Sequence, residues 1–128
     1  MIQERIQILF NKNVGPGYFK IGFNCQREYL KAKPGQFVML RLCDGIEPLL
    51  SRPFSIHGLN FQKGQLVGIE ILYKVVGSFT KKLSVLKKDE FIDILGPLGR
   101  GFSIPENIKR IFMVAGGIGV APMVFLAS

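Results

Sequence analysis

Two short motifs in the middle of the sequence carry residues suited to a diphosphate and an aromatic ring system. The first, RPFS at residues 52–55, places a guanidinium, an aromatic ring and a hydroxyl at the start of an apolar run, and a guanidinium binds phosphate oxygens through paired hydrogen bonds. The second, GSFT at residues 77–80, opens a predicted helix, where unpaired backbone N–H groups favour an anion. Together the two motifs predict a site for a flavin dinucleotide.

A third motif, VAGGIGVAP at residues 114–122, follows a β-like run and opens a second predicted helix, as nucleotide-binding loops do. A strand, crossover helix and returning strand need roughly 30 residues, and few residues follow Pro122. We therefore expect this second nucleotide site to be incomplete, as in a truncated chain. The predicted division is a finished barrel domain over residues 1–103 and the incomplete start of an α/β nucleotide-binding domain over residues 104–128.

Alternating apolar and polar residues predict a mainly β fold. The predicted strands cover residues 2–10, 19–24, 36–42, 53–59, 66–76 and 90–95, with turn residues between them. Six strands at close spacing, most with one apolar face, predict a small antiparallel barrel. One segment breaks the period of two, because Phe79, Leu83 and Leu86 have helical spacing with lysines opposite them. This spacing predicts one short amphipathic helix before the sixth strand.

The composition excludes several classes of protein. The formal net charge of +8 comes from scattered Lys and Arg residues without interleaved aromatic residues, so we predict no nucleic-acid partner. The positive charge instead suits phosphate-bearing cofactors and an acidic partner subunit. Cys25 and Cys43 stand far apart without CxxC spacing, which predicts neither a disulfide framework nor a zinc site and fits a reduced, cytoplasmic setting. No signal peptide and no membrane span is predicted, since glycines and a proline interrupt the uncharged segment 111–128.

The sequence offers no constellation of catalytic side chains. It contains no arrangement typical of a carboxylate pair, a Ser-His-Asp triad or a metal site, and its single histidine, His57, reads most simply as a polar side chain at a sheet edge. Flavin chemistry needs no protein acid or base. We therefore assign no catalytic residue and exclude a hydrolase.

Five segments resemble, in their order along the chain, the ferredoxin-NADP reductase superfamily, and within it the electron-transfer subunits of bacterial NAD-dependent dihydroorotate dehydrogenases. They are RPFS at 52–55, LYK at 72–74, GSFT at 77–80, GPLG at 96–99 and GGIGVAP at 116–122. The resemblance implies an FAD molecule bound in the barrel. The cofactor-binding residues that it implies are Arg52, Pro53, Phe54, Ser55, Leu72, Tyr73, Lys74, Gly77, Phe79, Thr80, Gly116, Gly117 and Gly119.

The resemblance also implies roles for these residues. Arg52 pairs with the diphosphate, while Phe54 packs beside the isoalloxazine and Ser55 hydrogen-bonds toward its reactive nitrogen. Pro53 fixes the entry to the strand. Residues 72–74 line the ribityl and adenosine part, and Thr80 with the helix start holds phosphate. The glycines of the third motif let a nicotinamide dinucleotide approach the backbone where the second domain is complete.

The function implied is that of a flavoprotein electron-transfer subunit in pyrimidine biosynthesis. Such a subunit passes electrons between NAD(H) and a partner catalytic dehydrogenase through FAD. The sequence does not distinguish NADH from NADPH as the nucleotide. Two alternatives remain: a flavin-binding module that is inactive with NADH alone, or a subunit of another NAD(P)H-linked complex of the glutamate-synthase-like, hydrogenase or sulfide dehydrogenase type. The full-length protein is expected to be an oxidoreductase subunit, and this chain alone is expected to be inactive.

Two features depart from the superfamily pattern. Phe79 stands where the family usually has a second glycine, so its Cβ and ring obstruct close approach of a diphosphate to that loop. Relatives carry a [2Fe–2S] cluster, whose four thiolate ligands this chain lacks. The apolar segment 111–128 is expected either to pair with a second copy in a homodimer or to fold back on its own barrel.

Overall fold

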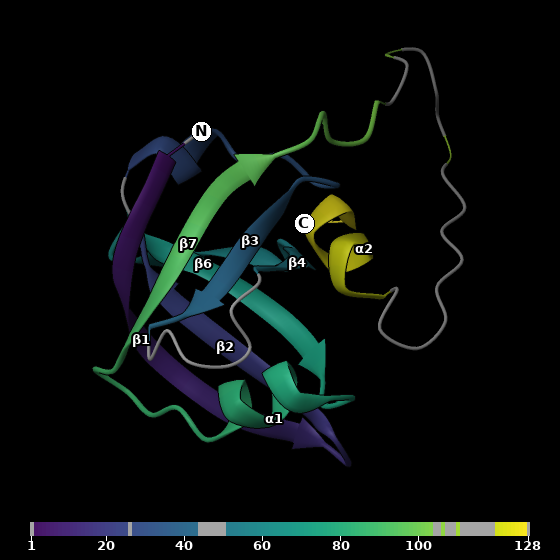
Figure 1. Cartoon of the computed structure of the whole chain (residues 1–128). Coiled ribbons are helices and arrows are strands. Elements are labelled where there is room, and N and C mark those ends of the chain that lie inside the picture. The colour runs from purple at the N-terminus through teal and green to yellow at the C-terminus, as the bar shows by residue number, and fades with distance from the viewer. Residues whose placement is uncertain are drawn as a thin grey trace.

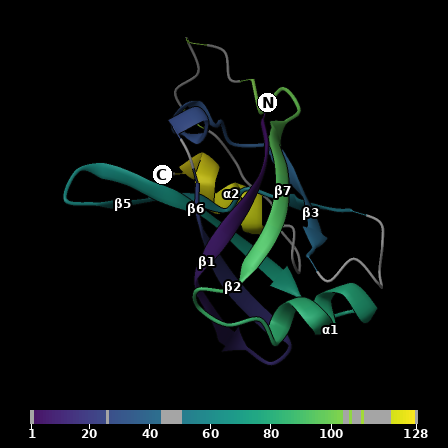
Figure 2. The same cartoon turned by 60° about the vertical axis from the view of Figure 1, so that its left-hand side comes forward.

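The computed structural model describes residues 2–25, 27–43, 51–103, 106, 110 and 120–127. Its described part is dominated by one antiparallel sheet, which Figures 1 and 2 show curling around a core. The order of strands in the sheet is β4-β3-β7-β1-β2-β6-β5. The strands are β1 (Ile2–Gly15), β2 (Tyr18–Asn24), β3 (Phe37–Leu42), β4 (Arg52–Ser55), β5 (Gly58–Gln62), β6 (Gln65–Lys74) and β7 (Phe91–Leu98).

The long strand β1 joins the two halves of the sheet. Its first part pairs with β7, and its second part pairs with β2, from Ile8 opposite Phe23 onward. An irregularity in the pairing follows Ile8, and such a break bends a strand and increases its twist. The inward residues come from the predicted alternation: Ile6 and Ile8 on β1, like Ile92 and Ile94 on β7, are at most 4% exposed. The predicted mainly antiparallel β fold is confirmed.

In the part of the chain that the structure describes, the sheet has seven strands where six were predicted for the barrel. The segment predicted as one strand, 53–59, is divided between β4 and β5, which lie at opposite ends of the strand order. Ile56 and His57 connect them: Ile56 N donates to Gln36 O at 3.1 Å, and His57 N donates to Glu70 O at 2.8 Å. Among the described residues no β4–β5 ladder forms, so the sheet is not closed by hydrogen bonds and the predicted barrel is only approximate.

Among the described residues, three helical segments accompany the sheet. The predicted amphipathic helix is α1 (Ser78–Ser84), which buries Phe79, Thr80 and Leu83. A 3-10 turn, η1 (Arg27–Lys31), was not predicted. The helix predicted after the glycine-rich loop is α2 (Val120–Ala127). The structure thus confirms the two helices that the sequence indicated.

Helix α2 lies against β5 and β6, and its Phe125 is buried. For these residues the structure matches the expectation that the C-terminal segment folds back on the barrel. The predicted strand 111–115 and the predicted cofactor residues Gly116, Gly117 and Gly119 lie outside the described residues. The division at residues 103 and 104 therefore stays a prediction.

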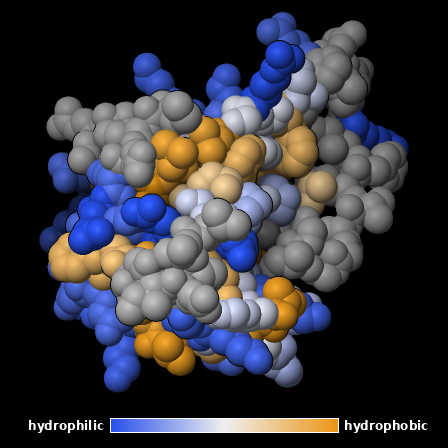
Figure 3. Space-filling model, viewed as in Figure 1, coloured by the Kyte–Doolittle hydropathy of each residue, from blue (hydrophilic) through white to orange (hydrophobic). Residues whose placement is uncertain are grey.

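One face of the molecule carries both hydrophobic and hydrophilic residues. On the face shown in Figure 3, hydrophobic residues adjoin one another in the upper centre, and hydrophilic residues surround them. Large exposed apolar side chains include Val76 and Val85, which flank α1. No described helix combines the length and the hydropathy required to cross a bilayer.

Candidate functional site

A pocket of about 590 Å³ opens between β4, the end of β6 and α1. Every predicted cofactor residue that the structure describes lines it. The lining consists of Arg52, Pro53, Phe54, Ser55, Leu72, Tyr73, Lys74, Val76, Gly77, Ser78, Phe79, Thr80 and Pro122. Val76, Ser78 and Pro122 were not among the predicted site residues. Val76 and Ser78 could have been predicted from the sequence, because they are next to predicted residues. Pro122 belongs to α2, which is distant from the other lining residues in the chain.

The curvature of the sheet brings these segments together. β4 pairs with β3, with Arg52 opposite Leu40, whereas β6 pairs with β2, with Tyr73 opposite Phe19. Although the two strands belong to different halves of the sheet, they contact each other across the barrel. α1 begins shortly after β6 ends and closes the third side of the pocket.

Aromatic rings form one wall of the pocket. The Phe54 ring meets Tyr73 edge-on, with centroids 6.2 Å apart and an interplanar angle of 79°. It also lies 5.9 Å from the Phe79 ring at 31°. Behind the wall, Phe19 stacks on Tyr73 at 5.7 Å. Tyr73 and Phe79 are almost fully buried, so the wall is rigid and suits a planar aromatic ligand.

The Tyr73 hydroxyl is hydrogen-bonded within the protein. Its hydroxyl donates to Asn11 Oδ1 at 2.9 Å, and Asn11 Nδ2 donates to the carbonyl oxygens of Leu83 (2.8 Å) and Leu86 (3.0 Å) at the end of α1. Burial raises the pKa of Tyr73 well above its usual value, so this phenol stays neutral. Asn11 thus ties β1, β6 and α1 together. No sequence signal identified Asn11, because its partners are distant in the chain.

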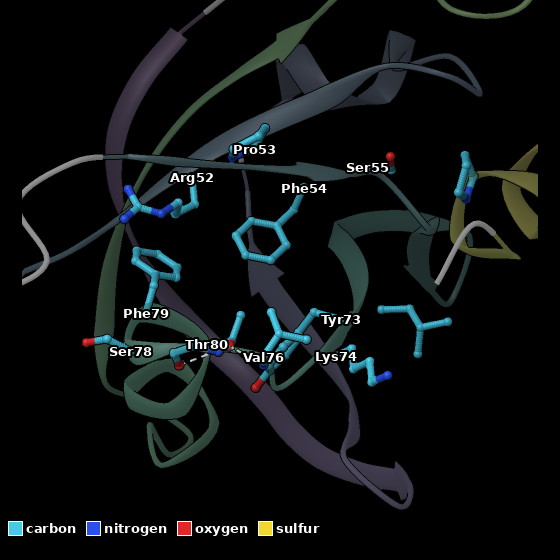
Figure 4. Close-up of a pocket in the computed structure, with 13 residues that line it drawn as sticks. Arg52, Pro53, Phe54, Ser55, Tyr73, Lys74, Val76, Ser78, Phe79 and Thr80 are labelled. Carbon is cyan, nitrogen blue, oxygen red and sulfur yellow. Dashed lines mark hydrogen bonds between the residues drawn. The ribbon is translucent and has the colours of Figure 1, made fainter. Parts of the chain in front are cut away.

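Positive charge stands at the rim of the pocket. The Arg52 guanidinium carbon lies 5.8 Å from the centroid of the Phe79 ring, and Arg52 Nη1 donates to Ser51 O at 3.4 Å. Figure 4 shows the guanidinium directly beside the Phe79 ring. Lys74 instead directs its ammonium over the Tyr18 ring, 5.7 Å from its centroid. Arg52 is therefore the cation best placed for an anionic ligand group.

The Thr80 hydroxyl organises the turn into α1. Thr80 Oγ1 accepts hydrogen bonds from the backbone N–H groups of Val76 (2.8 Å) and Gly77 (3.1 Å) and donates to Gly77 O at 3.3 Å. Its side chain is buried. The predicted direct contact between Thr80 and a phosphate stays a prediction, and what the structure assigns to this hydroxyl is the shape of the turn.

Gly77 leaves open space on the pocket side of this turn. Its backbone is extended, with φ −164° and ψ −168°, a conformation that any residue adopts. A Cβ built on Gly77 meets nothing within 4 Å. The protein itself therefore does not require glycine here, whereas a ligand that approaches the backbone closely would.

No side chain of the pocket is suited to acid–base catalysis or to metal binding. His57 lies between β4 and β5, the two strands at the ends of the sheet order, as expected of a residue at a sheet edge. Its side chain is buried and does not line the pocket. Among the described residues, no group of three or more His, Cys, Asp or Glu side chains could hold a metal ion. Cys25 and Cys43 are free thiols, and burial raises the pKa of Cys25 to about 12.

Comparison with known sequences finds relatives that share one description. No family model matches the chain. It is 45% identical over 118 residues to the dihydroorotate dehydrogenase B (NAD(+)) electron transfer subunit of Clostridium acetobutylicum, covering 92% of the chain and 44% of the relative. The same subunit of Desulforamulus reducens is 42% identical over 115 residues, with coverages of 90% and 43%. The chain spans less than half the length of these curated relatives.

Solved structures share the fold. An NADH-dependent reduced ferredoxin-NADP oxidoreductase, solved in relation to flavin-based electron bifurcation, superposes with a TM-score of 0.77 at 28% identity, over 92% of the chain and 41% of that structure. The chain therefore has the fold of ferredoxin-NADP reductases. A reductase of this type from Neisseria gonorrhoeae, solved with bound FAD and NADP, gives a TM-score of 0.71 at 18% identity, over 98% of the chain and 50% of that structure.

Phe79 is the departure from the superfamily motif inside this pocket. Its ring is 5% exposed and is enclosed by Phe54 and Arg52. The side chain has thus become part of the aromatic wall. Gly77, two residues earlier, has open space where a Cβ would stand, so the aromatic side chain at Phe79 does not fill the space beside Gly77.

Proposed function

We propose that this chain binds FAD in the described pocket and forms the flavin-carrying part of an electron-transfer subunit of the dihydroorotate dehydrogenase type. The observation that carries the proposal is the convergence of the residues predicted from separate motifs on one pocket. The 45% identity to an electron transfer subunit of dihydroorotate dehydrogenase B supports the same conclusion.

The pocket fits such a cofactor in size and chemistry. Its volume of about 590 Å³ lies within the range of cofactor sites, which are mostly apolar with a few placed polar groups. Phe54 and Tyr73 supply apolar ring surface, while Arg52 supplies a cation at the rim. Open space at Gly77 allows a bulky anionic group to approach the backbone.

Each residue has a distinct part in binding. Arg52 pairs with the diphosphate through charge-assisted hydrogen bonds, Phe54 packs beside the isoalloxazine and Ser55 offers its hydroxyl to the polar edge of the flavin. Leu72, Tyr73 and Lys74 bound the remainder of the ligand, and Pro53 stiffens the strand that carries the motif. Bound FAD supplies the exchange between two-electron and one-electron transfer; the chain binds it, orients it and excludes water.

The electron donor and the partner belong to the same proposal. Gly116, Gly117 and Gly119 contribute to the approach of NAD(H), and a catalytic dehydrogenase subunit receives or supplies the electrons in a cytoplasmic setting. A second candidate is a subunit of another NAD(P)H-linked complex, supported by the 28% identity to an NADH-dependent reduced ferredoxin-NADP oxidoreductase. Mixing the flavin-loaded protein with a purified dihydroorotate dehydrogenase catalytic subunit and dihydroorotate, or with reduced ferredoxin, and following reduction of its flavin separates the two candidates without NADH.

We also propose, as the second alternative for the C-terminal segment, self-association through the face of α2 that packing on the barrel leaves open, where Val124 is 45% exposed. Light scattering on the wild type and on Val124→Lys tests it. A dimer that becomes a monomer in the variant is the expected outcome, and a wild type that is monomeric at all concentrations contradicts it.

Flavin binding itself is tested by titrating the purified chain with FAD and following the quenching of flavin fluorescence. We expect saturable binding of one FAD per chain and weaker binding of FMN, which lacks the adenosine part. Absence of saturable binding at micromolar concentrations would overturn the proposed function.

A further inference from the structure

We propose that Phe79 is a positioning residue that holds the Arg52 guanidinium at the rim of the pocket, in the orientation that receives a diphosphate. This inference rests on the proposed function, because the diphosphate belongs to the proposed ligand. It assigns a role to the residue that departs from the usual glycine of the superfamily motif.

The geometry of the pair supports this role. The Arg52 guanidinium carbon lies 5.8 Å from the centroid of the Phe79 ring, within the range in which a cation is attracted to an aromatic face. The two residues come from β4 and α1, so their contact connects two walls of the pocket. Both side chains line the pocket, and Figure 4 shows them on the same side of it.

The Phe79 ring is a fixed platform. It is 5% exposed and is braced by the Phe54 ring, 5.9 Å away at 31°. Its backbone belongs to a turn that the Thr80 hydroxyl holds through hydrogen bonds to Val76 and Gly77. A ring immobilised in this way restricts the guanidinium beside it.

Restricting Arg52 has a direct consequence for binding. An arginine side chain loses considerable rotamer freedom when it binds a ligand, and prior orientation reduces that loss. A guanidinium over an aromatic face keeps its N–H edges available for phosphate oxygens. The ring therefore increases affinity only for ligands that carry a phosphate group. A ligand with the same flavin ring system and no phosphate gains nothing from it.

The test compares FAD with riboflavin, which has no phosphate, in the full chain. Phe79→Leu keeps an apolar side chain but removes the aromatic face. We expect the dissociation constant for FAD to rise about three- to tenfold, as for loss of one cation–π contact, and that for riboflavin to change less than twofold. Phe79→Trp restores an aromatic face and is expected to bring the FAD affinity back toward the wild-type value.

A double-mutant cycle with Arg52→Ala shows whether Phe79 acts through Arg52. We expect Phe79→Leu to have no further effect on FAD affinity once Arg52 is removed. The matched control is Leu83→Ala, which changes a buried residue of the same helix that does not line the pocket. It is expected to lower stability and to leave the ratio of FAD to riboflavin affinity unchanged.

Circular dichroism at the titration temperature shows whether each variant is folded. If Phe79→Leu is unfolded, Phe79→Met replaces it, with the same expected rise in the dissociation constant for FAD. Equal losses for FAD and riboflavin, or losses of Phe79→Leu and Arg52→Ala that simply multiply, overturn the inference while leaving the flavin site intact. A wild type that binds neither ligand overturns the proposed function and this inference with it.

Discussion

The Tyr73 hydroxyl donates a 2.9 Å hydrogen bond to Asn11 Oδ1, and through Asn11 the wall of the pocket is tied to the end of α1. The amide nitrogen of Asn11 donates to the carbonyl oxygens of Leu83 and Leu86, which lie at the end of α1 and just beyond it. The ring that faces the pocket and the helix that closes it are therefore held by one side chain.

Replacing Asn11 by Ala is expected to lower the free energy of unfolding by about 1–3 kcal/mol, because the Tyr73 hydroxyl loses its acceptor and the carbonyl oxygens of Leu83 and Leu86 each lose one donor. Urea denaturation measures this change. Asn13→Ala is the matched control, since the side chain of Asn13 on the same strand accepts an exposed hydrogen bond from the nearby Gly15 N, and its effect is expected to be smaller. Equal effects of the two substitutions would argue against the role of Asn11.

Removing the hydroxyl of Tyr73 separates its ring from its hydrogen bond. Tyr73→Phe is expected to cost about 0.5–1.5 kcal/mol of stability and to leave flavin affinity within about twofold, because the ring stays against Phe54. A large loss of flavin affinity with unchanged stability, measured by titration and denaturation, would instead mean that the hydroxyl contacts the ligand.

The pH dependence of stability follows from the same residue. Burial raises the pKa of Tyr73 in the folded state, so above about pH 10, the unfolded value, the unfolded chain loses its phenolic proton first. The contribution of Tyr73 is therefore present below pH 10 and is lost as the pH rises further. Denaturation between pH 8 and 11 is expected to show a steeper decline for the wild type than for Tyr73→Phe. Parallel curves would contradict this prediction.

Arg52→Ala is expected to weaken FAD binding tenfold or more, since a charge-assisted hydrogen bond contributes about 1.5–3 kcal/mol. Arg41→Ala is the control. Arg41 is an exposed arginine that pairs with Asp93 at 3.4 Å on β7 and does not line the pocket. Retention of FAD by Arg52→Ala at the wild-type affinity would refute the placement of the diphosphate.

Gly77→Ala is expected to reduce FAD affinity about tenfold, equivalent to about 1.4 kcal/mol, because the added methyl group occupies the space through which a ligand reaches the backbone. Stability should change little, since a Cβ at Gly77 meets nothing within 4 Å. Gly58→Ala adds a methyl group in equally open space outside the pocket and should leave FAD affinity unchanged. Unaltered affinity in Gly77→Ala would show that no ligand atom approaches this glycine.

Local patterns were sufficient for most of the strands and for the pocket residues. The alternation around Ile6 and Ile8 predicts β1, because one face of a strand must be apolar when it covers a core, and the helical spacing of Phe79 and Leu83 predicts α1. The RPFS and GSFT motifs are each four residues long, so they can be recognised from neighbouring residues in the sequence. Residues of both motifs line the same pocket, as the sequence predicted.

The split of the predicted strand 53–59 shows what the sequence could not determine. An alternating pattern specifies which face of a strand is apolar, but it does not specify which strands lie beside it. β4 pairs with β3 and β5 pairs with β6, so the chain must bend at Ile56 and His57 to reach both partners. The bend depends on where β3 and β6 lie in the curved sheet, and the residues near Ile56 do not specify those positions.

By itself, the sequence determined the strand and helix periods, the turns and the motifs that meet in the pocket, because these depend on residues close together in the chain. Only the tertiary structure decided that Asn11 supports Tyr73 and that Arg52 lies over Phe79. Each of these contacts joins segments far apart in the chain, and their distances are set by how the whole sheet curls.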